Sequence, residues 1–456
     1  MFKAVSSRVN IPEMDAGILQ YWKDKDVFHR TETERPDAPL FILFEGPPTA
    51  NGSPGIHHVL ARVFKDVICR HRTMKGFRCQ RKGGWDTHGL PVELEVEREL
   101  GLSSKQEIEA YGIAEFNARC RESVMRYVEQ WEDMTDRIGF WIDMDDAYRT
   151  YNRDYIESCW WILKTLWDAD LVYEARRTTP HCPRCETSLS SHELSLGYED
   201  DVADPSISIL FKVQPDSLPE SLSNFEGDTY LVAWTTTPWT LPGNSALAVA
   251  ADETYAVVRR GDDRLILARA RVDATLAAAD DESPPLDLSV PGSDLVGLTY
   301  EGLYDPREWG VPIFTFDGPR LVEWEDAGEP PARRVVDADF VSMYDGTGVV
   351  HIAPAFGIDD YTLGRDAGLL FIQPVDLKGR ITGENSPWQG EFVKDADPLI
   401  IAELDARGLL LTHETIRHTY PFCWRCGTPL LYYAKPSWYI ATTKVAASLQ
   451  RSNDEQ

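Results

Sequence analysis

The chain has 456 residues, of which 43% are hydrophobic and 11% aromatic, so it is long enough to bury two or three hydrophobic cores. No segment approaches the roughly 18 uncharged apolar residues that a membrane span requires, and residues 1–11 lack the apolar stretch of a signal peptide. The composition therefore excludes a membrane-spanning helix and predicts a soluble, cytoplasmic protein.

The formal net charge of −28 argues against an extended nucleic-acid-binding surface, because contacts to phosphate need Lys and Arg. Two explanations are open. The acidity is either a solvated surface suited to a high-salt cytoplasm, on which local basic patches still hold RNA, or a sign that the chain binds no nucleic acid. We favour the first explanation, because local basic patches can hold RNA on an acidic protein.

The first predicted elements are one N-terminal helix within residues 11–30 and a strand–loop–helix unit after it. Residues 41–44 (Phe-Ile-Leu-Phe) form a short apolar run that breaks at Gly46. A loop of small residues separates this run from residues 60–68, whose apolar side chains recur at helical spacing. This order is typical of the first unit of a nucleotide-binding α/β sheet, in which ligands lie beyond the carboxyl ends of the strands.

Gly55, His57 and His58 lie where this loop would turn into its helix. At a helix start, imidazoles and free backbone N–H groups can face the same phosphate. The alternative is a pair of capping or surface histidines.

Two long amphipathic helices are predicted next, over residues 123–141 and 155–167. Apolar side chains share one face of each, namely Val124, Tyr127, Val128, Trp131 and Met134 in the first and Ile156, Cys159, Trp160, Leu163 and Trp167 in the second. The aromatic residues on these faces are predicted to belong to the core.

Between residues 205 and 355 the pattern changes to short β-type runs separated by Pro, Gly and Asp. The runs are residues 206–213, 230–234, 255–258, 265–268 and 348–352. Their spacing predicts a separate β-rich domain. We assign it to residues 200–418, between a first segment at 1–199 and a third at 419–456. A helix is predicted over residues 398–409.

Four of the eight cysteines form two Cys-x-x-Cys pairs, Cys182 with Cys185 and Cys423 with Cys426, which bracket the predicted β-rich domain. In a cytoplasmic chain this pattern indicates a metal site rather than disulfides, and four thiolates suit a structural zinc ion. Such a site would pin the first and last strands of the domain together. Ordinary buried cysteines are the alternative.

The loop region resembles the class I aminoacyl-tRNA synthetases, most closely the isoleucyl members. The resemblance lies in Gly46-Pro47-Pro48-Thr49-Ala50-Asn51-Gly52 and above all in Gly84-Trp85-Asp86-Thr87-His88-Gly89-Leu90-Pro91-Val92-Glu93. The sequence departs from the family at Gly55-Ile56-His57-His58. The family usually has His-x-Gly-His there, as if the first His and the Gly had changed places.

The resemblance implies an α/β fold, with the first half of a Rossmann-type catalytic domain, an inserted β-rich editing domain and a zinc knuckle with four cysteine ligands. It implies ATP-dependent activation of isoleucine with Mg²⁺ and transfer to tRNA, so that the partners are tRNA, isoleucine and ATP. His57 and His58 would be the catalytic residues that bind the ATP phosphates, with Gly55 in the same ATP-binding loop. Pro47 and Asp86 would bind the amino acid, Asp86 through its ammonium group.

A second group of residues lies in the predicted β-rich domain. Thr235, Thr236 and Thr237 precede Asn244, and His351 and Asp360 come much later. Hydroxyls, a neutral imidazole and a carboxylate can hold an ammonium group and direct a water molecule at an ester without a metal. Together these residues resemble the editing site of isoleucyl-, valyl- and leucyl-tRNA synthetases. The resemblance implies that Asp360 binds the α-amino group and that the others surround the ester.

An editing site is needed because binding alone discriminates poorly between isoleucine and valine. One missing methylene changes binding by only ~1–3 kcal/mol, so a pocket for isoleucine needs a second, hydrolytic pocket to reject valine.

The sequence contains no Lys-Met-Ser-Lys-Ser loop and no helical domain that would read the anticodon. The resemblance therefore implies that the second half of the catalytic sheet lies outside this sequence and that the chain alone does not run the activation step. Three alternatives stay open: a stand-alone deacylase of mischarged tRNA, a non-catalytic tRNA-binding paralogue, and a valine-specific enzyme.

Overall fold

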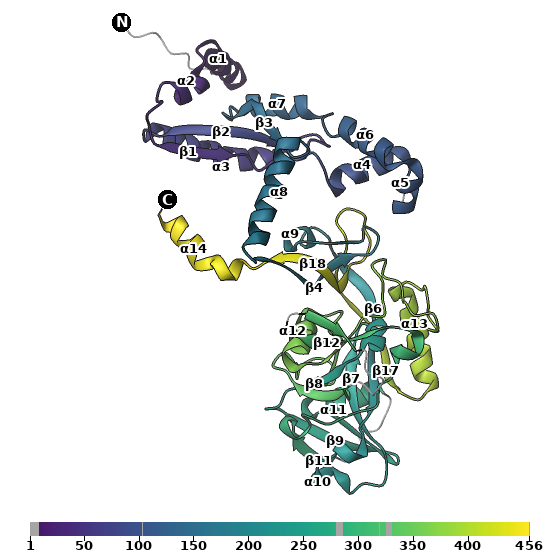
Figure 1. The fold of residues 1–456 in the computed structure, drawn as a ribbon. Helices are drawn as coiled ribbons and strands as arrows, with labels where there is room; N and C mark the ends of the chain where they lie inside the picture. The colour runs from purple at the N-terminus through teal and green to yellow at the C-terminus, as the bar shows by residue number, and fades with distance from the viewer. Residues whose placement is uncertain (1–8, 103, 280–285, 319, 325–330, 456) are drawn as a thin grey trace. The chain divides into compact units, whose positions relative to one another are not determined.

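The chain divides into two compact units, Met1–Leu171 and Val172–Gln456 (Figure 1). The computed structural model describes residues 9–102, 104–279, 286–318, 320–324 and 331–455. Among these residues, no helix combines the length and apolar character needed to cross a membrane.

The first unit is a three-stranded parallel sheet with the helices that precede and connect its strands. Its elements are α1 (Ile11–Asp24), α2 (Val27–Thr33), β1 (Leu40–Phe44), α3 (Ile56–Met74), β2 (Arg78–Trp85), α4 (Leu90–Leu100), α5 (Lys105–Tyr111), α6 (Ile113–Ser123), α7 (Val128–Arg137), β3 (Asp143–Arg149) and α8 (Arg153–Asp168). The strand order is β1-β2-β3, with Leu40 of β1 beside Arg78 of β2. The predicted strand, loop and helix are confirmed as β1, residues 45–55 and α3.

Two predicted helices differ in their bounds. The N-terminal helix is in fact two helices, because Asp26 takes a left-handed conformation (φ 49°) and so separates α1 from α2. The helix predicted over residues 123–141 is α7 alone, and Trp131 is buried within it as predicted.

The prediction that the aromatic side chains of residues 155–167 form a core is wrong. No described residue of α8 is buried, and the side chains of Trp160 and Trp161 are 66% and 69% exposed. The helix contacts the sheet near its first turn, where the ring of Tyr155 stacks on that of Tyr148 at a centroid distance of 5.7 Å. The rest of its apolar stripe lies on the surface of this structure.

The apolar sides of β1 and α3 are also exposed. On β1 the outward residues are Leu40, Ile42 and Phe44, and on α3 they are Leu60, Val63, Phe64, Val67 and Ile68. The buried residues of α3 are Arg62, Cys69 and Thr73. The helical periodicity was therefore predicted correctly, but the apolar residues that define it lie on the exposed side.

The second unit is mostly β-structure. Its strands are β4 (Val172–Cys182), β5 (Thr187–Ser188), β6 (Tyr198–Lys212), β7 (Thr229–Thr235), β8 (Ala246–Val249), β9 (Thr254–Arg260), β10 (Asp263–Ala268), β11 (Leu286–Pro291), β12 (Ile313–Asp317), β13 (Arg320–Glu323), β14 (Arg334–Asp337), β15 (Val350–Ile352), β16 (Leu370–Ile372), β17 (Leu410–Pro421) and β18 (Leu431–Ile440). Its α-helices are α9 (Ser191–Leu194), α10 (Glu220–Ser223), α11 (Val272–Ala278), α12 (Ile358–Ala367), α13 (Val393–Ala406) and α14 (Thr442–Asp454). Its 3₁₀ turns are η1 (Pro215–Ser217), η2 (Pro238–Gly243), η3 (Arg269–Arg271), η4 (Gly292–Asp294) and η5 (Pro306–Trp309).

The strands of this unit form one large mixed sheet and two smaller ones. The large sheet has the order β11-β9-β10-β7-β15-β8-β14, and β6 joins it by pairing with both β7 and β17. The smaller sheets are β13-β12-β16 and β18-β4-β5. Fully buried residues such as Phe211, Leu231 and Leu247 pack in one extended core against the large sheet. The five β-type runs predicted from the sequence are confirmed, since each overlaps one strand, namely β6, β7, β9, β10 or β15.

The helix predicted over residues 398–409 is α13, which begins five residues earlier, at Val393, with Pro398 inside it. The first Cys pair lies at the end of β4 and so belongs to the second compact unit. The predicted division into segments 1–199, 200–418 and 419–456 stays a prediction.

Candidate functional site

Gly55, the last residue of the loop between β1 and α3, is hydrogen-bonded to His58 in the first turn of the helix. Nδ1 of His58 accepts a hydrogen bond from the backbone N–H of Gly55 at 2.9 Å. Nδ1 is therefore unprotonated, and the neutral ring carries its proton on Nε2. Burial lowers the pKa of His58, and the neighbouring His57 and Arg62 lower it further. His58 is thus a neutral imidazole whose Nε2–H is its remaining donor.

His57 lies beside His58 and is exposed, with the two ring centroids 3.8 Å apart. A Cβ added to Gly55 would lie 2.7 Å from Cε1 of His57, so glycine at this position leaves the space that the His57 ring occupies. Trp131 supports the loop from α7. Its ring centroid is 4.5 Å from that of His58, and its Nε1–H donates to the carbonyl of Gly52 at 2.9 Å.

Pro47 and Asp86 follow β1 and β2 and lie at the carboxyl ends of these parallel strands. The backbone N–H of Asp86 donates to the carbonyl of Pro48 at 3.0 Å, and the hydroxyl of Thr49 donates to Oδ2 of Asp86 at 3.3 Å. Both predicted residues are half-buried. The structure thus joins the two loops that carry them, at the edge where α/β sheets bind their ligands.

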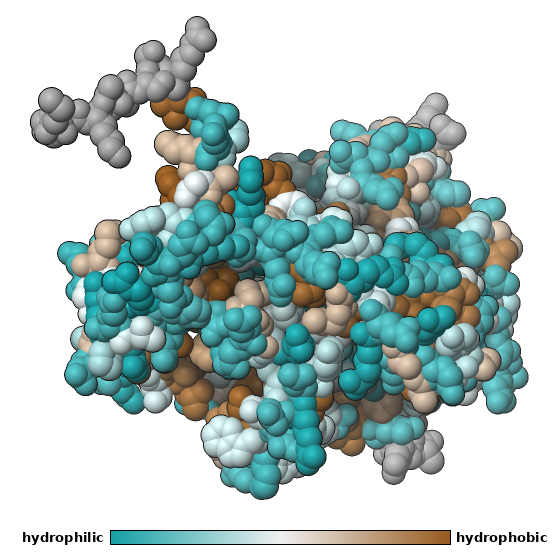
Figure 2. Space-filling view, turned by 90° about the horizontal axis from the view of Figure 1, so that it is seen from above, coloured by the Kyte–Doolittle hydropathy of each residue, from teal (hydrophilic) through white to brown (hydrophobic). Residues whose placement is uncertain are grey.

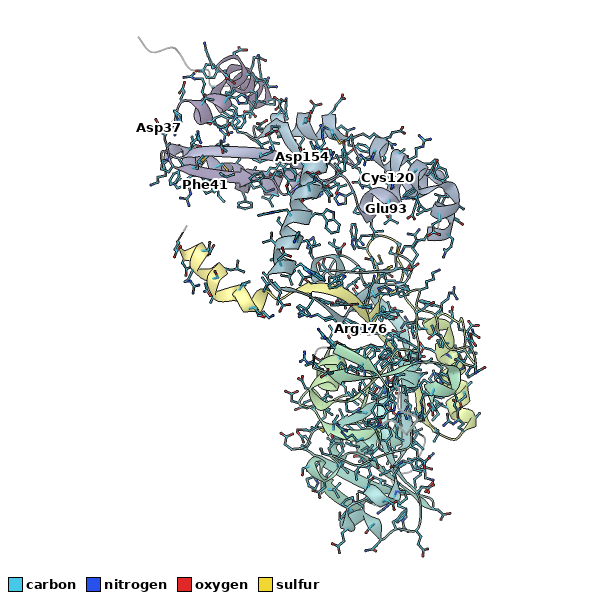
Figure 3. The ribbon with its side chains drawn as sticks, viewed as in Figure 1. Asp37, Phe41, Glu93, Cys120, Asp154 and Arg176 are labelled. Carbon is cyan, nitrogen blue, oxygen red and sulfur yellow. The ribbon has the colours of Figure 1, made fainter. Side chains whose placement is uncertain are left out.

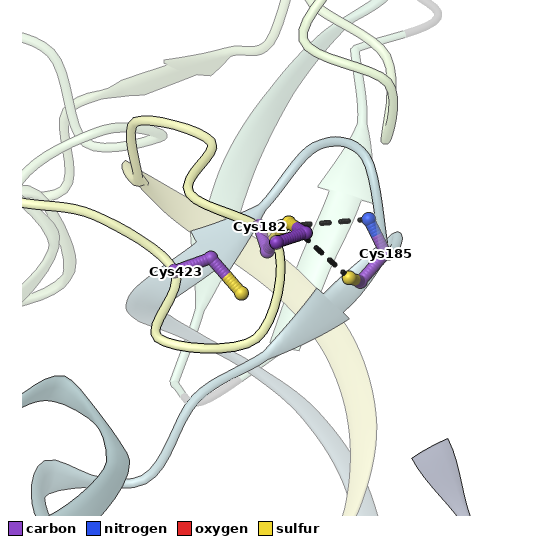
Figure 4. Close-up of side chains that lie close together, drawn as sticks. Cys182, Cys185 and Cys423 are labelled. Carbon is purple, nitrogen blue, oxygen red and sulfur yellow. Dashed lines mark hydrogen bonds between the residues drawn. The ribbon is translucent and has the colours of Figure 1, made fainter. Parts of the chain in front are cut away.

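The four cysteines of the two Cys-x-x-Cys pairs converge, with all four sulfur atoms within 4.8 Å of one another. Figure 4 shows three of them, Cys182, Cys185 and Cys423. The Sγ atom of Cys426 is 3.5 Å from that of Cys182 and 3.7 Å from that of Cys185. Tetrahedral zinc with bonds of about 2.3 Å requires sulfur atoms about 3.8 Å apart, so this arrangement fits the ion. The backbone N–H of Cys185 also donates to Sγ of Cys182 at 3.4 Å. Cys182, Cys185 and Cys423 are buried, as structural thiolate ligands usually are.

The predicted threonine row and His351 meet at the carboxyl end of β7. Val350 of β15 pairs with Trp234, so His351 lies beside the row that starts at Thr235. The Oγ1 atoms of Thr235 and Thr237 are 3.3 Å apart, and that of Thr237 is 3.4 Å from Oγ1 of Thr240. Thr236 is half-buried and makes no side-chain hydrogen bond within the described residues.

Both ring nitrogens of His351 are occupied. Asn244 Nδ2 donates to Nδ1 of His351 at 2.8 Å, so the ring proton is on Nε2, which donates to Thr240 Oγ1 at 3.1 Å. Burial lowers the pKa of His351 to about 4. The amide of Asn244 is fixed in turn by Tyr300, whose hydroxyl donates to Oδ1 of Asn244 at 2.8 Å. His351 is therefore a neutral ring that holds Thr240 and Asn244 in place.

Asp360 lies in the first turn of α12, and its Oδ1 accepts the backbone N–H of Ala353 at 2.7 Å. Ala353 is two residues beyond His351, so the carboxylate reaches the same strand exit, although it makes no hydrogen bond to the described threonines of the row. A Cβ on Gly357 would lie 2.0 Å from Oδ2 of Asp360, so glycine at this position leaves room for the carboxylate. Burial raises the pKa of Asp360 to about 6.

Comparison with known proteins assigns the chain to a family. Residues 17–456 match the family described as tRNA synthetases class I (I, L, M and V). The chain belongs to this family. Isoleucine–tRNA ligases of Dehalococcoides mccartyi (strain CBDB1) and Thermobifida fusca (strain YX) are 52% and 45% identical to it. These alignments cover 100% and 99% of this chain but 45% and 40% of the relatives, so the chain spans less than half the length of the curated relatives it matches.

One solved structure, described as the crystal structure of GlLeuRS-CP1, covers 46% of this chain and 99% of its own, with 16% identity and a TM-score of 0.33. The resemblance to class I synthetases that the sequence motifs indicated is confirmed by the family match.

In this class I synthetase chain, sequence reasoning missed three residues that hold the candidate sites. Thr240 lies three residues after Thr237 in the same hydroxyl-rich run, and that spacing is a signal that identifies it. Tyr300 is 56 residues from Asn244, and nothing in the local sequence predicts their contact. Trp131 was predicted as a core residue only, whereas it also supports the histidine loop.

Proposed function

We propose that this chain takes part in the two activities of an isoleucine–tRNA ligase, ATP-dependent activation of isoleucine and hydrolytic editing of valyl-tRNA. The family match supports the class of enzyme, and the relatives named above support isoleucine as the amino acid. The observation that carries the editing half is the buried hydroxyl–imidazole–amide network around His351, next to the carboxylate of Asp360.

The first unit is proposed as part of a Rossmann-type activation site for ATP, with Mg²⁺. The parallel order of its strands and the loop before α3 support this assignment. The start of a helix attracts anions, and the Nε2–H of His58 is a further donor for a phosphate oxygen. His57 is proposed as the second phosphate ligand from its exposed position. Asp86 is proposed to hold the ammonium group of isoleucine, with Pro47 beside it.

The second unit is proposed as the editing site. The carboxylate of Asp360 holds the α-ammonium group of the misattached valine. Thr235 and Thr237 present hydroxyls that orient a water molecule at the ester carbonyl. The water adds to the carbonyl carbon, and the bond to the ribose oxygen breaks, which releases valine and leaves the tRNA hydroxyl protonated. His351 acts as a positioning residue, because both of its nitrogens are already used.

The four clustered cysteines are proposed as the ligands of a structural zinc ion, which the sulfur–sulfur distances support. All eight cysteines lie among the described residues and none forms a disulfide, which suits the reducing cytoplasm proposed for the protein.

The test of the editing function is hydrolysis of valyl-tRNA by the 456-residue chain. Asp360→Asn is expected to slow hydrolysis by at least about 100-fold, since an ammonium group loses its half-buried carboxylate partner. Because the ammonium needs an ionised partner, the rate is expected to rise with pH through about 6 in the unchanged chain. Asp359→Asn is the matched control, since Asp359 is an exposed carboxylate on the same helical turn. Equal rates for Asp360→Asn and the unchanged chain would overturn the editing role.

A further inference from the structure

A groove in the second unit lies between β4 and α12 and has a volume of about 330 Å³. Arg176 and Arg177 line it from β4, and Arg365 lines it from α12, together with Tyr173 and Tyr361. Figure 3 shows Arg176 on β4 next to α12. None of the described residues that line the groove is acidic.

Each of the three guanidinium groups has neighbours that position it, and none of these neighbours is an acidic residue that lines the groove. Arg176 is half-buried, donates to Oε1 of Gln373 at 2.9 Å and lies over the ring of Phe371. Arg177 is exposed and lies over the ring of Tyr439, with a distance of 5.1 Å from Cζ to the ring centroid.

Arg365 donates to Oδ1 of the adjacent Asp366 at 2.8 Å, and both side chains are exposed. An exposed ion pair contributes roughly 0–1 kcal/mol, so a stronger anionic partner can replace Asp366.

All three arginines influence the phenol of Tyr361, which also lines the groove. Burial raises the pKa of the Tyr361 phenol, whereas Arg176, Arg365 and Arg177 all act in the opposite direction. Arginine side chains from both β4 and α12 therefore make the electrostatic potential at the hydroxyl of Tyr361 more positive. An anion in the groove would meet all three.

This groove is unusual in a chain with a formal net charge of −28. The face of the molecule in Figure 2 is covered largely by hydrophilic residues, with apolar patches between them. On so acidic a protein, an anion can be held only where basic residues cluster locally.

Aromatic rings next to the arginines favour a nucleic acid over an acidic peptide. Tyr173 and Tyr439 are cross-strand neighbours on β4 and β18, and their ring centroids are 6.0 Å apart. Guanidinium groups match phosphate oxygens through paired hydrogen bonds, and tyrosine rings stack on unpaired bases. An acidic peptide would use the charges but not the rings.

We propose that the β4–α12 groove binds the phosphodiester backbone of single-stranded RNA, with a base against Tyr173 and Tyr439. The helix that carries Arg365 also carries Asp360, on its opposite side by helical periodicity. RNA binding by the groove stands independently of the editing function. Its identification as the single-stranded end of tRNA rests on the proposed function.

The experiment measures binding of a fluorescein-labelled 12-nucleotide single-stranded RNA to the 456-residue chain by anisotropy, over a range of salt concentrations. Each contact to a single-stranded phosphate contributes about 0.7 to the slope of log affinity against log salt. The double variant Arg177→Ala/Arg365→Ala is therefore expected to lower that slope by about 1.4 and to weaken binding roughly 25-fold at about 0.1 M salt. The variant Arg177→Lys/Arg365→Lys keeps both charges and is expected to keep the slope.

The matched control is Arg407→Ala. Arg407 is an exposed arginine at the end of α13 that pairs with Glu403 at 3.1 Å and lies over the ring of Tyr304, so it resembles Arg365 in its surroundings. Its loss is expected to leave RNA binding unchanged. An unchanged slope in the double alanine variant, or equal binding of a 12-residue poly-glutamate peptide, would overturn the proposal.

Failure of the groove and failure of the editing function are distinguishable. Asp360→Asn is expected to keep RNA affinity while it loses hydrolysis of valyl-tRNA. If the double alanine variant also raises the KM for valyl-tRNA and leaves kcat unchanged, the bound RNA is the end of the tRNA. An unchanged KM with weakened RNA binding keeps the groove as an RNA site but separates it from editing.

Discussion

The β1–α3 layer of the first unit and the β7–β15 region of the second have similar apolar sequence patterns but opposite environments. Leu231 on β7 is fully buried in a closed core, whereas Leu60 on α3 is 62% exposed. Leu60 belongs to the predicted apolar face of residues 60–68, and Leu231 belongs to the predicted β-type run of residues 230–234. A periodic pattern thus predicts which side chains lie together, but not which element lies against them.

The difference extends to the candidate sites. In the second unit each group around His351 is held by a buried partner, so the network is rigid without a ligand. In the first unit His57 is exposed at the margin of an uncovered apolar layer, and its neighbour His58 is supported mainly by Trp131 and Gly55. The first-unit site therefore depends more on what binds to it.

The largest difference between the two units is expected when the proposed zinc ion is removed. Cys423→Ser is expected to abolish binding of one zinc ion per chain and to destabilise the second unit by about 5 kcal/mol or more, because zinc ligation contributes folding energy directly. The transition of the first unit should be unaffected. Metal analysis by mass spectrometry and calorimetry of the same preparation measure both effects. Cys159→Ser is the control, since Cys159 is exposed and is not a predicted ligand.

The next largest effect concerns Asp397 on α13, which is 3% exposed and whose Oδ1 accepts the backbone N–H of Trp239 at 2.9 Å. Burial raises its pKa to about 7 from an ordinary 3.8. The folded chain then binds the proton more tightly than the unfolded chain, so this group's contribution to stability is lost as pH rises from about 4 to about 7. Asp397→Asn keeps the acceptor without the charge and is expected to stabilise the second unit at about pH 8 by up to about 4 kcal/mol.

Chemical denaturation at pH 4 and pH 8 checks this expectation. The stabilising effect of Asp397→Asn should be absent at pH 4, where the carboxyl is largely protonated in the folded state and the charge no longer has to be buried. If the difference in unfolding free energy between the variant and the unchanged chain is the same at pH 4 and at pH 8, then Asp397 does not titrate as its burial requires.

A matched pair of leucines tests the comparison directly. Leu231→Ala is expected to destabilise the second unit by about 3 kcal/mol, because it leaves a cavity in a closed core. Leu60→Ala is expected to change the stability of the first unit by less than about 0.5 kcal/mol, because its side chain is largely exposed. Similar losses for the two variants, measured by calorimetry, would mean that the β1–α3 layer is covered in solution.

The sequence predicted the helices, the strands and the clusters of site residues well. It predicted poorly which elements far apart in the sequence pack against one another. The convergence of the two Cys-x-x-Cys pairs could be predicted because the spacing of metal ligands is a strong local pattern. The strands could be predicted because the β-type runs are local patterns as well. The contact of Tyr300 with Asn244 depends on how distant strands align, which no local pattern specifies. Trp160 is exposed because no other described element of the first unit covers its face of α8. The apolar spacing of the helix does not specify whether such a covering element is present.

The smallest effect is the pH dependence that His58 contributes to the stability of the first unit. The folded state lowers the pKa of His58 below its ordinary 6.5, so the unfolded chain binds the proton more tightly. The contribution of His58 to the stability of the first unit is therefore lost as pH falls below about 6.5, whereas the contribution of Asp397 to the second unit is lost as pH rises. His58→Ala should remove this slope and also cost about 1 kcal/mol, because the N–H of Gly55 loses its cap.

His57→Ala is the matched control, since His57 is exposed and accepts no bond from the helix start within the described residues. The fluorescence of Trp131, which lies against His58, reports the titration, and hydrogen exchange in the first turn of α3 reports the cap. The protonated ring quenches the indole, so the midpoint is expected below 6.5 in the unchanged chain. A midpoint at or above that value would mean that His58 is not held neutral by the loop.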